Sequence, residues 1–194
     1  MNEQIAGIIQ RISLLELELE AELAKRRAEL RFGLERGRVV FEAEVLRRHR
    51  ELRTRLWTYI SHARPMIVIT APFIYGLIVP LVLLDLSVML YQAVCFPAYG
   101  LKKVRRRDYL VFDRHHLAYL NALEKLNCAY CSYANQLLAF VREVAARTEA
   151  YWCPIKHAQR IVAAHDQYRE FVEYGDAEAY RARVAALSAG PKTT

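Results

Sequence analysis

Cysteine and histidine side chains in the C-terminal half of the chain have the types and spacing of metal ligands. They follow the pattern C-x2-C-x21-C-x3-H and comprise Cys128, Cys131, Cys153 and His157. Thiolates combined with one imidazole are ligands that structural zinc or an iron–sulfur cluster accepts. Zinc or iron–sulfur binding is therefore one hypothesis for this chain.

The spacing between the two halves of this set opposes a site within one chain. The stretch from Cys131 to Cys153 contains no glycine or proline and is typical of a continuous helix. Twenty-two helical residues separate the two thiols by roughly 33 Å, and bonds of about 2.3 Å cannot bridge that gap. A site requires a helix break near Asn135 followed by a reversal, or two chains packed antiparallel. The alternatives are that the cysteines are small packing residues, or that Cys128 and Cys131 form a redox pair.

No motif of a known catalytic type accompanies these residues. The chain has no G-x-x-x-x-G-K, G-x-G-x-x-G, G-x-S-x-G or H-E-x-x-H, which are the patterns of phosphate loops, dinucleotide sites, hydrolases and zinc proteases. His115 and His116 beside Asp113 are typical of a polar helix start. We predict no catalytic residue, and an enzyme is not favoured.

The elements that must position such residues are organised around an apolar run from Met66 to Ala98. Its only formal charge is Asp85, and it is interrupted by Pro72, Pro80 and Pro97. About 20 apolar residues suffice to cross a bilayer. The run therefore predicts a membrane-inserted segment over residues 65–99.

Basic residues crowd both sides of this run, in a chain of net charge +7. Lysine and arginine are enriched in the cytoplasmic flanks of membrane segments, so two similar clusters predict that both ends stay on the cytoplasmic side. We then expect an intramembrane helical hairpin that bends near Gly76 and Pro80, the alternative being a single kinked transmembrane helix. Membrane proximity already explains the cations, so nucleic acid is not predicted as a partner. The flanking residues are Arg47, Arg48, Arg50, Arg53, Arg55 and Arg64 on one side, and Lys102, Lys103, Arg105, Arg106 and Arg107 on the other.

Asp85 is a functional-site hypothesis because an ionisable group at membrane depth costs roughly 2.5–3.5 kcal/mol. It could carry protons or bind a cation, or it could be hydrogen-bonded to Ser87 or Tyr91. No second ionisable residue lies in the run, which makes a poor ion path.

Residues 1–64 predict an amphipathic, coiled-coil-like helical arm. We expect a helix to about residue 32, a joint at Gly33 and Gly37, and a second helix over 38–62. Apolar residues at spacings of three and four form a seam that suits self-association, a partner helix, or the protein's own C-terminal helices. The seam consists of Ile5, Ile8, Ile12, Leu15 and Leu19.

Residues 100–175 predict a cytoplasmic helical hairpin that carries the Cys/His set. Its first helix is expected to start at Asp108 or Asp113 and to end near Thr148. A turn at Pro154 leads to a second helix that ends near Gly175. Residues 176–194 predict a short helix over 176–187 and a loose tail.

The stretches YLNALEKLNCAYCSYANQ and REVAARTEAYWCPIKHA resemble an uncharacterised group of bacterial membrane-associated proteins that carry NCAYCSYAN and YWCPIKHA. The resemblance covers roughly residues 66–160. It implies a bacterial protein of the inner membrane and implies no reaction.

The sequence as a whole predicts an all-α, membrane-anchored protein whose soluble parts face the cytoplasm. The expected function is that of a helical scaffold or accessory subunit, which binds the lipid bilayer and either itself or a partner protein. The alternative is a membrane-attached metal-binding or electron-transfer protein. Apart from the zinc or iron–sulfur centre of that alternative, no cofactor is expected.

Overall fold

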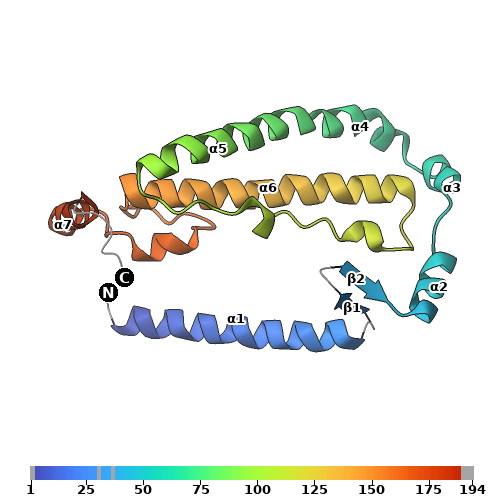
Figure 1. The fold of residues 1–194 in the computed structure, drawn as a ribbon, viewed down its shortest axis with the longest axis horizontal. Helices are drawn as coiled ribbons and strands as arrows, with labels where there is room; N and C mark the ends of the chain where they lie inside the picture. Colours follow the sequence, from blue (N-terminus) through green and yellow to red (C-terminus); the bar gives the residue numbers. More distant parts are fainter. Residues whose placement is uncertain (1–2, 30–31, 36–37, 189–194) are drawn as a thin grey trace. The chain divides into compact units, whose positions relative to one another are not determined.

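The computed structural model describes residues 3–29, 32–35 and 38–188 (Figure 1). These residues are helical apart from one short strand pair and connecting segments, so the all-α prediction is confirmed in its main elements. The chain divides into two compact units. One comprises Met1–His62 and Asp113–Leu126, and the other comprises Ala63–Phe112 and Asn127–Thr194.

The first unit begins with the long helix α1, Glu3–Glu29, which is followed by a two-stranded antiparallel hairpin. β1 (Phe32–Glu35) pairs with β2 (Arg38–Phe41) so that Phe32 lies opposite Phe41. Two short helices follow, α2 (Ala43–Glu51) and α3 (Leu56–Ser61). The single helix predicted over 38–62 is therefore wrong, because the β-branched and aromatic run at 39–41 favours a strand. Of the predicted joint, Gly37 lies outside the described residues.

The start of helix α6, Ala122–Trp152, closes the first unit, and a capping box fixes it. The Asn121 carboxamide oxygen accepts the N–H groups of Leu123 and Glu124, each at 3.0 Å. The Glu124 carboxylate accepts the Asn121 N–H at 2.8 Å. These reciprocal bonds satisfy donors that a helix start leaves open, so α6 begins there and not at Asp108 or Asp113 as predicted.

The second unit contains the apolar run, which forms α4 (Pro65–Gly76) and α5 (Ile78–Ala98), separated only by Leu77. Figure 1 shows that the chain continues through this joint without reversing. Pro80 falls in the first turn of α5, where backbone N–H groups lack helical partners in any case. Of the two interpretations of the run, the structure therefore contains the kinked helix and not the hairpin.

Helix α5 ends in a Schellman motif at Gly100, whose φ is 68°. The Leu101 N–H donates to the Phe96 carbonyl at 2.8 Å, and the Gly100 N–H donates to the Pro97 carbonyl at 3.2 Å. The left-handed backbone at this position favours glycine. The motif turns the chain into a return segment, Leu101–Phe112, that contains the 3₁₀ turn η1 (Arg106–Asp108).

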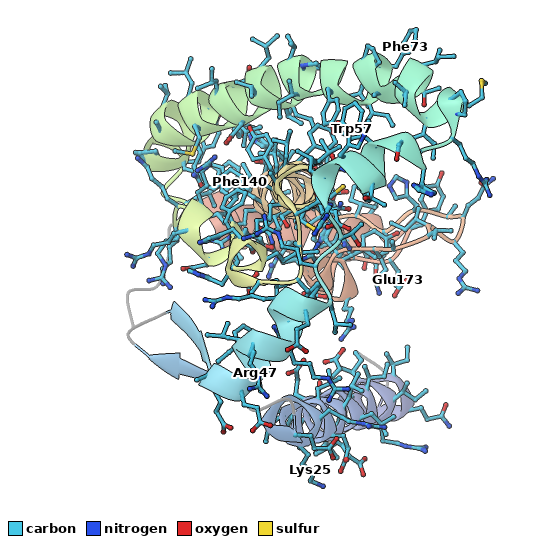
Figure 2. All side chains as sticks on the ribbon, turned by 90° about the vertical axis from the view of Figure 1, so that its right-hand side faces the viewer. Lys25, Arg47, Trp57, Phe73, Phe140 and Glu173 are labelled. Carbon is cyan, nitrogen blue, oxygen red and sulfur yellow. The ribbon has the colours of Figure 1, made fainter. Side chains whose placement is uncertain are left out.

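Helix α6 runs parallel to α4 and α5 and beside them (Figure 1). The residue numbers of the contacting partners increase together along both helices: Tyr75 contacts Asn127, and Tyr91 contacts Thr148. Figure 2 shows Phe140 in the interior of this unit and Phe73 on the side of α4 that faces away from it. The buried core comprises Phe96, Val104, Leu137, Phe140 and Val144.

Beyond α6 the second helix of the predicted hairpin is not formed. Residues 153–176 make an irregular loop with one 3₁₀ turn, η3 (Asp166–Glu170), and an isolated bridge between Ile155 and Val172. Tertiary bonds hold this loop, since the Arg142 guanidinium donates to the carbonyls of Ala163 and Ala164. The short C-terminal helix α7, Ala177–Ser188, is formed as predicted. The tail from 189 onward, expected to be loose, lies outside the described residues.

Candidate functional site

The charge of the apolar run is balanced by an arginine from the basic flank. Asp85 lies on the inner side of α5 and is 7% exposed. The Arg106 guanidinium binds its carboxylate in a bidentate manner, from Nε to Oδ1 at 3.0 Å and from Nη2 to Oδ2 at 2.5 Å. Asp85 does not pair with Ser87 or Tyr91 as considered from the sequence, and its ionisable partner lies outside the run.

A tyrosine from α6 completes this polar cluster. The Tyr133 hydroxyl donates to Oδ2 of Asp85 at 3.0 Å. Burial and this hydrogen bond raise the pKa of Tyr133 above its usual value. The bond to Asp85 likewise raises the pKa of Arg106. The cluster is an ion pair with a neutral donor, an arrangement that joins α5, the return segment and α6.

Two glutamine side chains hold the return segment, each by bonding to both the N–H and the carbonyl of one residue. The Gln92 carboxamide on α5 accepts the Val104 N–H at 2.5 Å and donates to its carbonyl at 3.2 Å. The Gln136 carboxamide on α6 does the same for Val111, at 2.6 and 3.0 Å. Each glutamine replaces the backbone partner that an extended segment lacks. These glutamine clamps fasten the return segment to α5 at Val104 and to α6 at Val111.

The remaining basic flanks behave as solvated cations. Arg106 is half-buried against Asp85, whereas the other ten flanking residues predicted from the sequence are exposed. Arg105 pairs with Asp108 at 2.8 Å. Lys102 and Lys103 form no ion pair with any residue that the structure describes. Arg106 is therefore a correction to the predicted set, because its charge serves the protein interior.

The predicted metal ligands do not meet within the chain. Helix α6 continues through Asn135, whose side chain donates to the Cys131 carbonyl at 2.9 Å. Cys153 follows the far end of that helix, and the His157 ring stacks on Tyr168 with centroids 6.2 Å apart. Among residues 3–29, 32–35 and 38–188, no group of three or more His, Cys, Asp or Glu side chains is arranged to hold a metal. Of the two routes to a site, the break near Asn135 is absent, and the antiparallel pair of chains stays a prediction.

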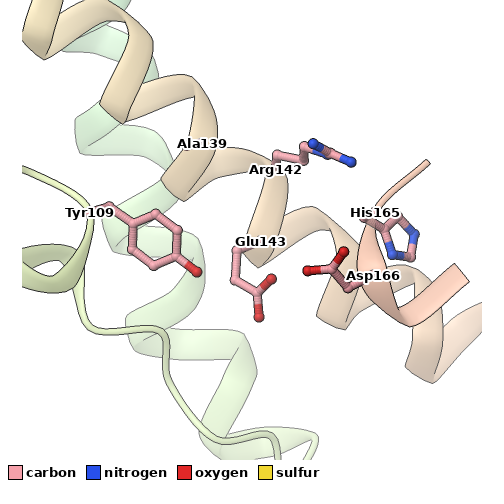
Figure 3. A pocket seen from close by; sticks show the side chains of 6 residues that line it. All are labelled: Tyr109, Ala139, Arg142, Glu143, His165 and Asp166. Carbon is pink, nitrogen blue, oxygen red and sulfur yellow. The ribbon is translucent and has the colours of Figure 1, made fainter. Parts of the chain in front are cut away.

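A small polar depression of about 180 Å³ lies beside α6, where the C-terminal loop passes Tyr109. Figure 3 shows the Tyr109 hydroxyl and the Asp166 carboxylate directed toward Glu143 from opposite sides. Burial and the nearby Glu143 charge raise the pKa of Tyr109. The depression is lined by Tyr109, Ala139, Arg142, Glu143, His165 and Asp166.

Structural partners engage three of the ionisable side chains of this depression, those of Glu143, His165 and Arg142. Glu143 pairs with Arg147 at 2.8 Å, and His165 bonds to Glu149 at 2.8 Å. Arg142 is engaged by the backbone carbonyls of the loop. These contacts fasten the C-terminal loop to α6, and they indicate a structural role.

The outward side of the apolar helix and the seam of α1 are both exposed. Pro65–Ala98 is, within the described part of the chain, the one helix long and apolar enough to span a membrane. All five seam residues of α1, from Ile5 to Leu19, are exposed as well. These are the apolar surfaces for which a partner outside this chain can be sought.

Sequence reasoning missed the inward partners of the apolar helix. Asp85 and Gln92 are seven residues apart and so share one helix face. This spacing in the sequence could have predicted that α5 has an inward, polar-bonded side. Their partners, Arg106 and Val104, come from a segment whose path no periodicity reveals. Gln136 and Tyr133 carry no signal of their own.

No protein-family model, no curated protein and no solved structure matches this chain. The geometry of its own residues is therefore the basis for assigning a function.

Proposed function

We propose that this protein is a membrane-anchored helical scaffold. In this proposal α4 and α5 attach the chain to the bilayer, and α1 offers its seam to a second copy or to a partner helix. The observation that carries the proposal is the exposed apolar surface of Pro65–Ala98.

The unfavourable free energy of exposing this apolar surface to water supplies the driving force for attachment. Burying apolar area contributes about 25 cal/mol per Å², and soluble monomers rarely expose contiguous apolar patches beyond a few hundred Å². Side chains exposed along the run include Ile69, Phe73, Val79, Leu83, Leu86 and Leu90. Transfer of these side chains into lipid removes a cost that the folded chain in water would bear.

The cations beside the run support a placement of the soluble parts on the cytoplasmic side of a membrane. Exposed basic residues near a membrane surface are each worth about 1 kcal/mol with anionic lipid. Arg64 directly precedes α4, and Lys102 and Lys103 follow α5. That this membrane is a bacterial inner membrane is part of the proposal and rests on the sequence resemblance alone.

The exposed seam of α1 supports the second half of the proposal. An isolated amphipathic helix gains most of its stability from packing of its apolar face. The seam would provide that packing as a knobs-into-holes contact with another helix. No observation on the described residues favours the metal-binding alternative.

Membrane attachment is tested by fractionation of lysed cells without detergent. The full chain is expected in the membrane pellet and is expected to stay there after a high-salt wash, since burial of apolar area resists salt. Recovery of the intact protein in the supernatant would overturn the proposal.

Seam pairing is tested by cysteine crosslinking in a background with the four native cysteines replaced by alanine. Leu15→Cys in the seam is expected to form a crosslinked species in membranes, with itself or with a partner. Glu18→Cys, on the same helix outside the seam, is the matched control. Equal crosslinking at both positions would contradict a defined seam.

A further inference from the structure

The two sides of α5 differ in burial and in polar content. Its inner face carries Leu81, Asp85, Val88, Gln92 and Phe96, which are buried or half-buried. Its outer face, defined as Val79, Leu83, Leu86, Leu90 and Val94, is exposed and wholly apolar. The members of each face are spaced by three and four residues, so each set forms one continuous stripe along the helix.

Polar bonds fasten α4 and α5 to their neighbours over most of the length of the apolar run. The Tyr130 hydroxyl on α6 donates to the Ile74 carbonyl at 2.6 Å near the joint of α4 and α5. The Asp85–Arg106 pair lies midway, and the Tyr91 hydroxyl meets that of Thr148 at 3.0 Å near the far end. Separating α4 and α5 from α6 and from the return segment would leave each of these groups without its partner.

The geometry points to an in-plane membrane helix. We propose that α4 and α5 lie along one leaflet of an anionic bilayer, with the outer face among the acyl chains and α6 on the water side. This inference rests on the membrane attachment proposed above and adds the orientation of the anchor. It replaces a helix that crosses the bilayer by a helix that lies along the membrane surface.

A crossing helix conflicts with the contacts of α6. Because α6 runs alongside α4 and α5, a crossing that keeps the contacts would carry Arg142, Glu143 and Arg147 of α6 into hydrocarbon. Charged groups at that depth are strongly disfavoured. A crossing without α6 would instead expose Asp85 and Gln92 to lipid. An in-plane orientation keeps the charged residues of α6 in water and also keeps Asp85 and Gln92 away from lipid.

Length and charge agree with in-plane seating. Residues 65–98 span roughly 51 Å as a helix, well beyond a hydrocarbon core of about 30 Å. Exposed cations stand at both ends of the run, Arg64 before α4 and Lys102 and Lys103 after α5, where they can reach anionic headgroups of a single surface. Interfacial helices normally supply their own polar face, and here α6 and the return segment supply it.

Depth-dependent quenching of single tryptophans tests this orientation. The full chain with Trp57→Phe and Trp152→Phe receives one tryptophan at Phe73, Leu83 or Leu90, and it is reconstituted in anionic phosphatidylglycerol-containing vesicles with bromines at shallow, middle or deep acyl positions. All three probes are expected to be quenched alike, and most by shallow bromines. If the bromine position that quenches most is deeper for the tryptophan at Leu83 than for the one at Phe73, the helix crosses the bilayer and the inference is overturned.

A probe on the opposite face supplies the matched control. Val88→Trp on the inner face is expected to be quenched at least threefold less than Leu83→Trp. If that variant fails to fold by circular dichroism, Leu81→Trp takes its place. Equal quenching on both faces would mean that lipid surrounds α5, which also overturns the inference.

Two further outcomes separate this inference from the proposed function. Failure of the unmodified protein to sediment with the vesicles would overturn membrane attachment itself. Sedimentation with unquenched outer-face probes would mean that the protein binds the vesicles through another surface, and it would overturn the in-plane inference while membrane association itself stands.

Discussion

Asp85 is the formal charge of the apolar run, and its surroundings decide whether it is a transport group or a structural one. A bidentate guanidinium and a tyrosine hydroxyl occupy its carboxylate. Bidentate Arg–carboxylate pairs fix both orientation and charge state. With both oxygens engaged, the residue holds the return segment in place and presents no open position for a cation.

Loss of Arg106 is expected to expose the structural role of this pair. Arg106→Ala leaves Asp85 buried with Tyr133 alone and should lower the free energy of unfolding by about 2 kcal/mol. This is below the range for fully buried pairs because the Arg106 side chain is 40% exposed. Arg107→Ala is the matched control, since that side chain is 78% exposed and should change stability by less than about 0.5 kcal/mol. Denaturant titration in detergent micelles, followed by circular dichroism, measures both, and equal effects would argue against the inward role of Arg106.

The two glutamine clamps allow a comparison within one molecule. Gln92→Leu removes partners from Val104, which is buried, and should cost about 2 kcal/mol because a buried N–H and carbonyl lose their bonds. Gln136→Leu should cost less than about 1 kcal/mol, because exposed Val111 can bond to water. Hydrogen exchange at the Val104 and Val111 amides reports each clamp separately. A larger loss of protection at Val111 than at Val104 would reverse this interpretation.

At the scale of elements, the long apolar helix is shaped by its two ends and its joint. Pro80 is tolerated because it stands in the first turn of α5, so the run kinks at Leu77 and does not fold back. Gly100 ends α5 with a positive φ and turns the chain toward α6. Local residue chemistry therefore sets the direction of the return segment, and the return segment brings Arg106 to Asp85.

Two glycines in this region are expected to respond oppositely to alanine. A Cβ at Gly76 would meet no heavy atom within 4 Å, so Gly76→Ala should stabilise the unit by about 0.5 kcal/mol through reduced freedom of the unfolded chain. Gly100→Ala places a side chain on left-handed backbone and should destabilise the unit by about 1 kcal/mol. Paired denaturation curves measure the difference. Stabilisation by both substitutions would contradict the Schellman motif.

The helices were predictable where one pattern dominated. The apolar stripe of α1 and the uninterrupted stretch before Cys153 gave two long helices, although the capping box at Asn121 was overlooked. The strand at Arg38–Phe41 and the irregular loop after Pro154 were not foreseen. In the loop, Arg142 binds the backbone carbonyls of 163 and 164, a tertiary contact that local propensity cannot express. The partner of Asp85 was missed for the same reason.

At the scale of the whole molecule, the exposed cations at the two ends of the run and the contacts of α6 lead to one expectation for topology. Both cationic flanks favour the cytoplasmic side. Helix α6 shares a unit with α4 and α5 and carries charged residues that disfavour hydrocarbon. Both ends of the chain are therefore expected to stay on the cytoplasmic side, where the chain is synthesised.

Topology reporters at the two termini are therefore expected to report the same, cytoplasmic compartment. Fusions of an enzyme active only in the cytoplasm should be active at either end, and fusions of an enzyme active only outside should be silent at both. As a control for reporter function, a known transmembrane segment inserted before the C-terminal reporter should move that reporter alone. The expectation depends on the cationic flanks as well as on the fold. One terminus found outside in the unmodified chain would mean that α4 and α5 cross the bilayer, and α6 would then have to separate from the face on which Asp85 and Gln92 are bound.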